Sequence, residues 1–315
     1  MRRFALLSIA VLLAGCGGER GGGDDNGGAT VDSDLSGRIQ ADGSSTVGPY
    51  TTAAAERFRA VHPDVRITVG VSGTGGGFER FCAGETDLSD ASRAIEDDEK
   101  AACAKNGIEY VEFQVANDAL TVVVNPENDW VDCLTVAQLR RIWDTGSKVK
   151  SWSDLDPSFP DASMKLYGAG TDSGTFDYFT GAINGEEGRS RSDYSATEDD
   201  NVTVQGVAGG KGALGYFGLS YYEQNKDRLK ALEIDGGDGC VAPSVETAQN
   251  GTYKPLSRPL FIYAKKASFA RAEVHAFIEF ILDNEREIAG AAQFVPLTDE
   301  QLTKAKADLA AASAG

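Results

Sequence analysis

Short apolar runs alternate along the chain with segments in which apolar residues recur at helical spacing. The predicted strands are residues 66–71, 108–115 and 164–167, and the predicted helices are residues 77–83, 135–143 and 176–183. Strands and helices that alternate in this way are typical of α/β architecture. We therefore expect an α/β fold.

Two further extended segments, residues 119–125 and 259–265, are the least polar of the predicted strands, and prolines flank them. They are candidates for strands that cross between two lobes. The segment 269–289 carries an apolar stripe at helical spacing, which predicts a closing helix that packs on a core. The residues of this stripe are Val274, Phe277, Ile278, Ile281, Leu282 and Ile288.

A chain of 315 residues suits one large domain or two of ordinary size. If the closing helix returns to the first lobe, that lobe comprises residues 35–118 and 263–315. The second lobe is then residues 119–262, including the crossover strands.

The N-terminus has the pattern of an export signal. Two arginines precede an apolar run at residues 4–14 that is too short to span a bilayer. The run ends in Leu-Ala-Gly-Cys, which resembles the bacterial lipobox, so residues 1–16 are predicted to be a lipoprotein signal peptide with Cys16 as the lipidation site. Residues 17–34 are rich in Gly and Asp and predict a flexible tether. We expect an exported protein that is lipid-anchored in the cell envelope.

Composition narrows the choice of function. Apolar residues make up 41% and charged residues 25%, which is ordinary for a globular protein. The 48 acidic and 30 basic residues give a net charge of −18, which opposes broad attraction to nucleic acid or to anionic lipid. Nucleic-acid binding is therefore not expected.

The remaining cysteines favour disulfides over a metal site. They are Cys82, Cys103, Cys133 and Cys240. They contain no CxxC pair and belong to a chain with an export signal. Three pairings are possible. We favour Cys82 with Cys103 and Cys133 with Cys240, because the other two pairings would link one lobe rigidly to the other. Because disulfides are favoured, we expect no metal. We expect no cofactor either, since no nucleotide-binding glycine motif occurs in its expected context.

Three loops of small residues each precede a predicted helix: residues 42–49, 72–78 and 170–176. The first N–H groups of a helix lack intrahelical partners, and glycine allows a ligand to approach closely, so such loops can bind anions. One such loop is usually an ordinary helix cap. Three loops, two in one lobe and one in the other, predict convergence on one small tetrahedral anion.

Residues 84–93 follow the second loop and carry two further candidates. Arg93 offers a planar guanidinium for oxyanion contact, and Asp87 could accept a hydrogen bond from a ligand hydroxyl. A surface ion pair is the alternative reading of both residues.

These motifs together resemble the phosphate-binding proteins of bacterial Pst-type ABC importers. The stretches that carry the resemblance are residues 42–47, 72–78, Asp87 with 91–93, and 172–175, supported by 139–144, 152–155, 212–216 and 219–221. The resemblance covers about residues 40 to 290. It implies a type II periplasmic-binding-protein fold, with two α/β lobes joined by two crossover strands. It also implies a protein, expected to be monomeric, that closes over inorganic phosphate and delivers it to a membrane permease.

The resemblance also implies the site residues. Those expected to bind phosphate are Ser45, Thr46, Val47, Ser72, Thr74, Asp87, Ser173, Gly174 and Thr175. Many family members have an arginine shortly before the Ser-Gly-Thr, but residues 167–171 contain no basic residue, and Arg93 is our candidate for this charge. Asp87 would act as the selector, because hydrogenphosphate can donate its proton to a carboxylate and sulfate has none to donate.

Two alternatives stay open from the sequence. An exported phosphatase or other hydrolase with a Ser-His-Asp triad would need His62 or His275, and we expect both to be structural. A surface protein that senses phosphate on the same fold would keep the binding residues without the transport role. We expect no enzymatic activity.

Overall fold

A computed structural model of the chain describes residues 35–171 and 173–313. The expected signal peptide, Cys16 and the tether at 17–34 lie outside these residues. Among the described helices, none is both long enough and apolar enough to cross a membrane.

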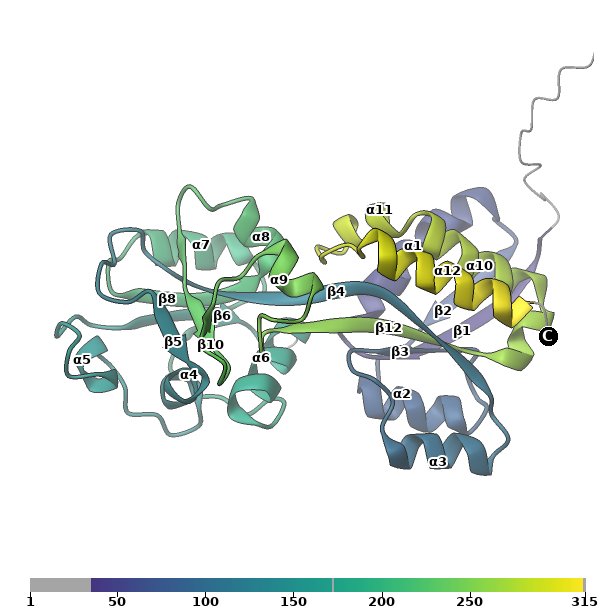
Figure 1. Cartoon of the computed structure of the whole chain (residues 1–315), viewed down its shortest axis with the longest axis horizontal. Coiled ribbons are helices and arrows are strands. Elements are labelled where there is room, and N and C mark those ends of the chain that lie inside the picture. The colour runs from purple at the N-terminus through teal and green to yellow at the C-terminus, as the bar shows by residue number, and fades with distance from the viewer. Residues whose placement is uncertain (1–34, 172, 314–315) are drawn as a thin grey trace, which may run out of the picture. The chain divides into compact units, whose positions relative to one another are not determined.

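A nine-stranded sheet forms the centre of the structure (Figure 1). Its strand order is β2-β1-β3-β12-β4-β8-β6-β7, and β9 also pairs with β4. The nine strands are β1 (Gly37–Gly43), β2 (Val65–Val69), β3 (Leu88–Ala91), β4 (Tyr110–Val124), β6 (Lys165–Ala169), β7 (Ser195–Thr197), β8 (Ala213–Gly218), β9 (Lys230–Ala231) and β12 (Ser257–Lys265). A second sheet has the order β11-β10-β5 and consists of β5 (Cys133–Thr135), β10 (Glu233–Asp235) and β11 (Cys240–Val241).

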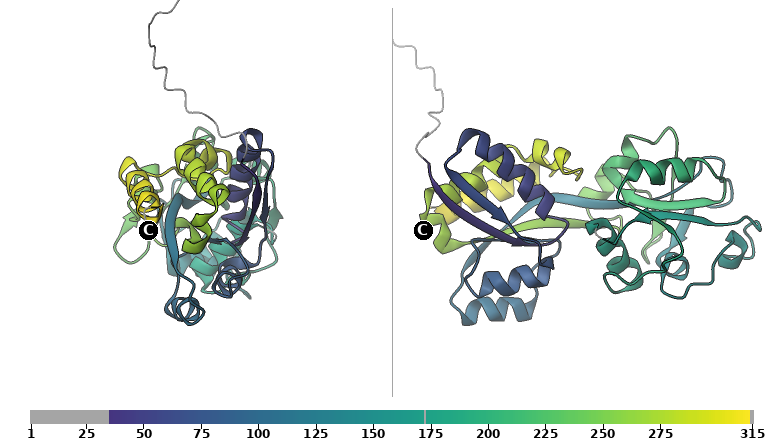
Figure 2. Two further views of the ribbon diagram at one scale, coloured as in Figure 1. Left: turned by 90° about the vertical axis from the view of Figure 1, so that its right-hand side faces the viewer. Right: turned by 180° about the vertical axis from the view of Figure 1, so that it is seen from behind.

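Helices cover both faces of the large sheet. Those packed on the end of the sheet that contains β1–β3 are α1 (Gly48–Val61), α2 (Gly73–Cys82), α3 (Asp97–Lys105), α10 (Ala272–Asp283), α11 (Glu285–Ala291) and α12 (Asp299–Ser313), with the 3-10 turn η1 (Lys266–Ala270). Those at the other end are α4 (Val136–Trp143), α5 (Trp152–Leu155), α6 (Gly174–Asn184), α7 (Asp200–Ala208), α8 (Leu219–Glu223) and α9 (Val245–Gln249). Figure 2 shows that α2 and α3 lie on the opposite face of the sheet from α1 and α10–α12.

Apolar side chains form two main cores, and we call the elements around them the first and second lobes. The first core joins β1–β3 to α1 and α10–α12, and the second joins β6 and β8 to α4–α6. Strand β4 contributes to both, because it runs from Phe113 in the first core to Val124 in the second, whereas β12 contributes to the first core and follows Leu256 of the second. The expected α/β fold of two lobes joined by two crossover strands is confirmed.

Strand β4 corrects one sequence prediction. The segments 108–115 and 119–125 were expected as separate strands, but one strand of 15 residues contains both. Residues 115–124 of this strand are buried throughout. A strand that is covered on both faces needs no turn between its apolar runs, so the polar pair Asn117 and Asp118 does not interrupt it.

The closing helix is also divided. The expected helix at 269–289 consists of α10 and α11, which meet at Asn284. The Asn284 side chain donates a hydrogen bond to the Phe280 carbonyl at 2.8 Å, a local bond that competes with continuation of the helix. All six residues of the predicted stripe are buried, so the stripe itself is confirmed.

A third connection lies beside the crossover strands. The loop between α11 and α12 bonds to β4 through Asn117 and Val295, whose backbone groups exchange hydrogen bonds of 2.8 and 2.9 Å. Gln249 of α9, in the second lobe, donates to the Pro296 carbonyl at 2.8 Å. The C-terminal segment therefore contacts both lobes next to the crossover strands.

Both expected disulfides are present. Cys82 at the end of α2 is bonded to Cys103 in α3. Cys133 on β5 is bonded to Cys240 on β11, so this bridge spans the intervening strand β10. Each bridge lies within one lobe, as the favoured pairing required.

We expect the Cys133–Cys240 bridge to stabilise the second lobe strongly. It closes a loop with a sequence separation of 107 residues, for which the chain-entropy model gives about 4 to 5 kcal/mol. Cys240 is exposed and Cys133 partly buried, so replacing both by Ser removes the cross-link and little packing. Urea unfolding of the double variant should show this loss of unfolding free energy. An unchanged midpoint would contradict the entropic account.

A second prediction concerns Glu285, the first residue of α11, which is 1% exposed. Burial raises the pKa of its carboxyl group to about 7, although the Leu297 N–H donates to it at 2.7 Å. Between about pH 5 and 7 the folded protein keeps a proton that the unfolded chain has lost, so stability falls as the pH rises through this range and levels off above it.

Glu285→Gln is neutral at every pH and should lack this fall. The free energy of unfolding of the variant, relative to that of the wild type, should rise by up to about 1.4 kcal/mol for each pH unit between pH 5 and 7. Thermal unfolding across this range measures the difference. A difference independent of pH would show that Glu285 is ionised in the folded protein.

Candidate functional site

The predicted loops follow the carboxyl ends of parallel strands. In the first lobe β1 pairs in parallel with β2 and with β3, and in the second lobe β6 pairs in parallel with β7 and β8. The loop at 44–47 follows β1, the loop at 70–72 follows β2, and residues 170–173 follow β6. In α/β sheets this edge is where ligands bind.

The first loop is held in shape by one hydroxyl group. Ser44 Oγ accepts hydrogen bonds from the backbone N–H groups of Thr46 at 3.2 Å and Val47 at 3.4 Å. Pro49 lies in the first turn of α1, as predicted. The Val47 N–H is therefore engaged within the loop, while the Ser45 and Thr46 side chains project from it toward the second lobe.

The second loop rests on a buried carboxylate. Ser72 Oγ donates to Asp42 at 2.6 Å, and Asp42 also forms an ion pair with Arg80. One residue into α2, Thr74 Oγ1 lies 3.0 Å from Ser92 Oγ, at the end of β3. These bonds join the ends of β1, β2 and β3 into one surface.

The third loop begins helix α6. Ser173 caps the helix by accepting a hydrogen bond from the Thr175 N–H at 3.1 Å. The Gly174 carbonyl accepts a hydrogen bond of 3.4 Å from Thr46 Oγ1, in the other lobe. A Cβ atom at Gly174 would lie 2.8 Å from Thr46 Oγ1, so only glycine allows this approach.

Arg258 supplies the positive charge between the lobes, and the sequence analysis missed it. It lies on the crossover strand β12, and its guanidinium donates to Thr46 Oγ1 at 2.8 Å through Nη2 and to Asp118 at 3.2 Å through Nε. The guanidinium carbon lies 3.5 Å from the centre of the Tyr178 ring, on α6. One basic residue at the start of an otherwise apolar crossover strand was the signal that could have indicated it.

A cavity of about 190 Å³ lies where these groups meet. Its lining consists of Ser44, Ser45, Thr46, Val71, Gly73, Thr74, Ser92, Asp177, Glu187 and Arg258. Water occupies about 30 Å³ per molecule in the liquid, so the cavity has the volume of about six waters and accommodates a small oxyanion. A larger groove of about 630 Å³ between α1 and β2 is lined by none of the predicted site residues.

The structure brings together some predicted residues and not others. Ser45, Thr46 and Thr74 line the cavity. Ser173, Gly174 and Thr175 form the adjoining end of α6, whereas Ser72 and Val47 support the loops from behind. The other lining residues were not predicted from the sequence: Ser44, Val71, Gly73, Ser92, Asp177, Glu187 and Arg258.

Asp87 is misplaced in the prediction. It directly precedes β3, which begins at Leu88, so it lies at the amino end of the strand, away from the loops at the carboxyl end. Its carboxylate accepts hydrogen bonds from Ser268 at 2.9 Å and from the Gln40 N–H at 3.0 Å, and pairs with Arg271 at 3.1 Å. Asp87 therefore cannot read the proton of a ligand in this cavity.

Arg93 also lies outside the cavity lining. Its guanidinium forms two hydrogen bonds, of 2.7 and 2.8 Å, with the carboxylate of Glu99 on α3. The surface ion pair weighed as the alternative is therefore the arrangement in this structure, and Arg258 holds the position between the lobes.

A buried carboxyl group lies beneath the site. Asp90 on β3 is fully buried and accepts a hydrogen bond of 2.8 Å from Thr51 of α1. Its pKa is raised to about 7: burial raises it most, the Thr51 hydrogen bond lowers it, and the nearby charge of Asp42 raises it by a smaller amount. Near neutral pH a protonated fraction of Asp90 thus limits the negative charge under the loops.

One group of side chains among the described residues has ligand atoms close enough for a metal ion: Cys133, Glu233 and Cys240. The two sulfur atoms are bonded to each other, which leaves a single carboxylate as a possible metal ligand.

The cavity between the lobes holds hydroxyl groups and charges suited to an oxyanion.

Comparison with known proteins supports this reading. A family model described as a PBP superfamily domain matches residues 27–285. Protein SphX of Synechococcus elongatus is 48% identical over 85% of this chain and 80% of its own length. The phosphate-binding protein PstS of Staphylococcus epidermidis is 42% identical over 92% of this chain and 86% of its own.

Solved structures agree in fold. The crystal structure of a possible phosphate binding protein from Planctomyces limnophilus matches with a TM-score of 0.86 and 48% identity, covering 89% of this chain and 99% of that one. An ABC-type phosphate transport receptor from Vibrio cholerae, 22% identical, shares the fold with a TM-score of 0.64 over 82% of this chain and 99% of its own. The resemblance inferred from the sequence motifs is confirmed: the chain belongs to the PBP superfamily and, within it, to the family of the phosphate-binding protein PstS.

Proposed function

We propose that this protein captures inorganic phosphate in the cavity between its two lobes and delivers it to the membrane permease of an ABC importer. One observation carries the proposal: three kinds of group meet at one cavity of about 190 Å³. They are the hydroxyl groups of the first-lobe loops, the first turn of α6 and the guanidinium of Arg258. The membership of the PstS family points to the same ligand.

The ligand contacts follow from the geometry. Ser45, Thr46 and Thr74 donate hydroxyl hydrogen bonds, and the free N–H groups at the start of α6, behind Ser173, face the anion with the positive end of the helix dipole. Arg258 contributes Nη1, for which the structure has no protein partner among the described residues. Ser72 and Val47 act by holding the loops, and Gly174 by allowing close approach.

The net charge of −18 does not oppose binding. At physiological ionic strength the Debye length is about 8 Å, so distant exposed carboxylates are screened, while a ligand in the cavity responds mainly to the groups that line it. Dissolved phosphate therefore meets local donors rather than the charge of the whole surface.

We infer that Asp177 takes the selector role expected of Asp87. Asp177 lines the cavity in the first turn of α6 and accepts a hydrogen bond of 3.2 Å from Ser45. Hydrogenphosphate can donate its proton to this carboxylate, whereas sulfate would meet it with unpaired lone pairs. Asp177 thus lies among the donors that bind the anion, where Asp87 does not.

Isothermal titration with phosphate and then sulfate tests the proposed function directly. We expect one phosphate per protein and no competition from sulfate. Absence of phosphate binding by protein freed of endogenous ligand would overturn the proposal.

Arg258→Ala should weaken phosphate binding by roughly 10- to 100-fold, since a hydrogen bond to a charged group contributes about 1.5 to 3 kcal/mol. The variant also leaves Asp118 unpaired and buried, so Arg258→Lys is the matched control: it restores a charge next to Asp118 but not the planar guanidinium. Titration gives the affinity and thermal unfolding the stability. Wild-type affinity in a folded Arg258→Ala variant would remove Arg258 from the site.

Asp177→Asn should narrow the preference for phosphate over sulfate at least tenfold, because the amide can donate to sulfate and no longer requires a proton from the ligand. Glu187→Gln is the control, as Glu187 is the other carboxylate of the lining but is exposed. Competition titration measures both ratios. Equal ratios in the wild type and in Asp177→Asn would assign selectivity elsewhere.

We propose in addition that the protein is exported, anchored through lipidated Cys16 and active as a monomer. The supporting evidence is the lipobox-like sequence before the tether and a cavity completed within one chain. Labelling of cells with a radioactive fatty acid, compared with Cys16→Ser, tests the anchor. A sensing protein would bind phosphate without a part in phosphate uptake. Phosphate uptake by a strain that lacks the gene for this protein therefore distinguishes transport from sensing.

The hydrolase alternative has one geometric feature in its favour. His275 Nε2 lies 2.8 Å from Ser313 Oγ, and His275 Nδ1 lies 3.9 Å from Glu279. However, Ser313 Oγ donates its proton to the Leu309 carbonyl at 2.8 Å, so the hydroxyl is hydrogen-bonded to the backbone of α12 rather than donating to His275. A phosphatase assay on wild-type protein and on Ser313→Ala decides this alternative.

A further inference from the structure

The segment between α11 and α12, residues 293–298, lies where the chain crosses between the lobes, and we call it the strap. At the end of α11 the Phe294 N–H donates to the Ala289 carbonyl at 2.8 Å, and Gln293 has a φ of 62°. This left-handed conformation commonly ends a helix. The chain therefore leaves α11 through a defined turn and enters the strap in a fixed direction.

The strap pairs with the crossover strand β4. Val295 of the strap and Asn117 of β4 form an isolated antiparallel bridge, and the Asn117 side chain donates to the Pro296 carbonyl at 3.3 Å. Asn117 directly precedes Asp118, the partner of Arg258. The strap is therefore attached to the crossover strand one residue from the ion pair at the candidate site.

The strap also belongs to the first lobe. The Leu297 N–H donates to Glu285 of α11 at 2.7 Å. Thr298 accepts a hydrogen bond of 3.1 Å from the Gln301 N–H at the start of α12. Since α11 and α12 both pack on the first core, the strap moves with the first lobe.

The second lobe meets the strap through α9, which lies next to β4 (Figure 1). Gln249, the last residue of α9, donates from Nε2 to the Pro296 carbonyl at 2.8 Å. The Gln249 carbonyl accepts a hydrogen bond of 3.3 Å from Gln301 Nε2. Val295 of the strap belongs to a small buried cluster that also contains Ala119 of β4, Leu219 of α8 and Ala248 of α9. Two hydrogen bonds and an apolar contact thus connect the lobes here.

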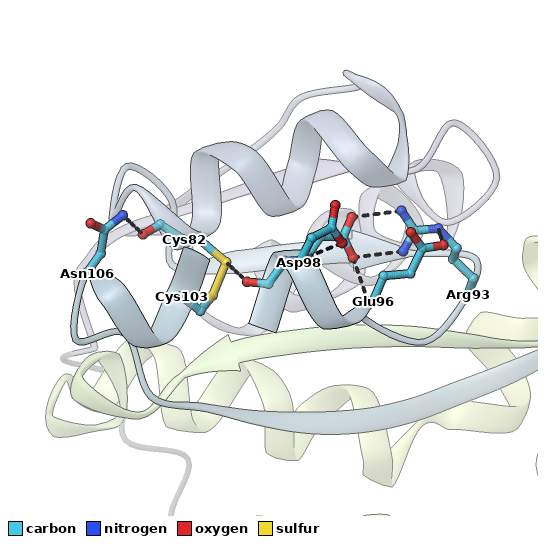
Figure 3. Close-up of a disulfide and its surroundings, with 7 residues drawn as sticks. Cys82, Arg93, Glu96, Asp98, Cys103 and Asn106 are labelled. Carbon is cyan, nitrogen blue, oxygen red and sulfur yellow. Dashed lines mark hydrogen bonds and ion pairs between the residues drawn. A yellow bond between two sulfur atoms is a disulfide. The ribbon is translucent and has the colours of Figure 1, made fainter. Parts of the chain in front are cut away.

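Disulfides do not restrain the lobes relative to each other. The Cys82–Cys103 bridge joins α2 to α3 within the first lobe (Figure 3), and the Cys133–Cys240 bridge lies within the second. In the part of the chain that the structure describes, no disulfide crosses between the lobes. Rotation about β4 and β12 is therefore opposed by non-covalent contacts, among them those of the strap.

The contacts at the strap and at the cavity occur in one arrangement of the lobes. Across the cavity, Ser45 donates to Asp177 and Thr46 donates to the Gly174 carbonyl. A rotation of the lobes displaces Gln249 relative to the strap, because the two belong to different lobes. Hydrogen bonds weaken steeply with changes in distance and angle. The strap bonds therefore stabilise the arrangement in which the donor groups converge on the cavity.

We propose that the strap is a third hinge segment and that Gln249 is a positioning residue, which favours phosphate capture through its bond to Pro296. A protein that spends a smaller fraction of its time in the binding-competent arrangement binds its ligand more weakly, in proportion to that fraction. This inference rests on the proposed function, because phosphate is the ligand whose capture the strap favours. Gln249 itself does not line the cavity.

Gln249→Ala tests the proposal with inorganic phosphate as the probe. The substitution removes the side-chain bond to the strap and leaves every residue of the cavity lining unchanged. Phosphate binding should weaken about two- to tenfold, the range that corresponds to one hydrogen bond, and phosphate should dissociate faster. Isothermal titration measures the affinity, and stopped-flow measurement of phosphate release gives the rate.

Gln205→Ala is the matched control. Gln205 is an exposed glutamine on α7, also in the second lobe, and its side chain forms no hydrogen bond with the strap among the described residues. The control should bind phosphate with the affinity of the wild type. An effect of equal size in both variants would contradict a specific role of the strap.

Small-angle X-ray scattering separates a positioning role from a merely structural one. Ligand-free Gln249→Ala should have a larger radius of gyration than the ligand-free wild type, and saturating phosphate should remove the difference. Thermal unfolding verifies that the variant is folded. A lower unfolding temperature with unchanged scattering and unchanged affinity would show that the strap only stabilises the fold.

The outcomes distinguish this inference from the proposed function. Wild-type protein that binds no phosphate overturns the proposed function, and capture of phosphate through the strap falls with it. If wild-type protein binds phosphate and Gln249→Ala binds it equally tightly, the role of the strap is overturned and the proposed function stands.

Discussion

The ion pair between Arg258 and Asp118 connects the two crossover strands with both lobes at the candidate site. The two residues face each other across the crossover strands β12 and β4. The same guanidinium bonds to Thr46 of the first lobe and stacks on Tyr178 of the second. Their side chains are 14% and 8% exposed, so removing one partner would leave a buried charge, which typically costs about 3 to 5 kcal/mol. The crossover strands and the candidate site therefore share one interaction.

The candidate site is built from dipoles more than from charges. Hydroxyl groups on three loops and the start of α6 surround a lining whose carboxylates outnumber its cation. The loops are held in shape by their own hydrogen bonds, as in Ser44 Oγ with the Thr46 N–H or Ser72 Oγ with Asp42. Groups that are fixed before the ligand arrives need little reorganisation on binding. In the proposed function, the carboxylate of Asp177 among these groups would favour an anion that carries its own proton.

The sequence predicted local features correctly and failed on contacts between distant parts of the chain. The loops at 44–47, 72–74 and 173–175 were identifiable because Gly, Ser and Thr before a helix have a local physical meaning. The apolar stripe of α10 and α11 was identifiable for the same reason, while the break at Asn284 depended on one side-chain bond. The errors concern distance along the chain: Asp87 lies only five residues before Ser92, yet a strand separates them, and they lie at opposite ends of it.

By itself, the sequence determined the α/β class, the two lobes, the three loops of small residues and the family, because each of these is expressed in local spacing or in ordered motifs. It favoured the disulfide pairing among three possibilities through the expected division into lobes. Only the tertiary structure decided which charged side chains reach the cavity. Arg258 and Asp177 enter it from elements 81 residues apart, and Arg93 is drawn aside by a carboxylate on α3. A long charged side chain goes to the partner that the folded chain places within its reach, and its position in the sequence does not specify that partner.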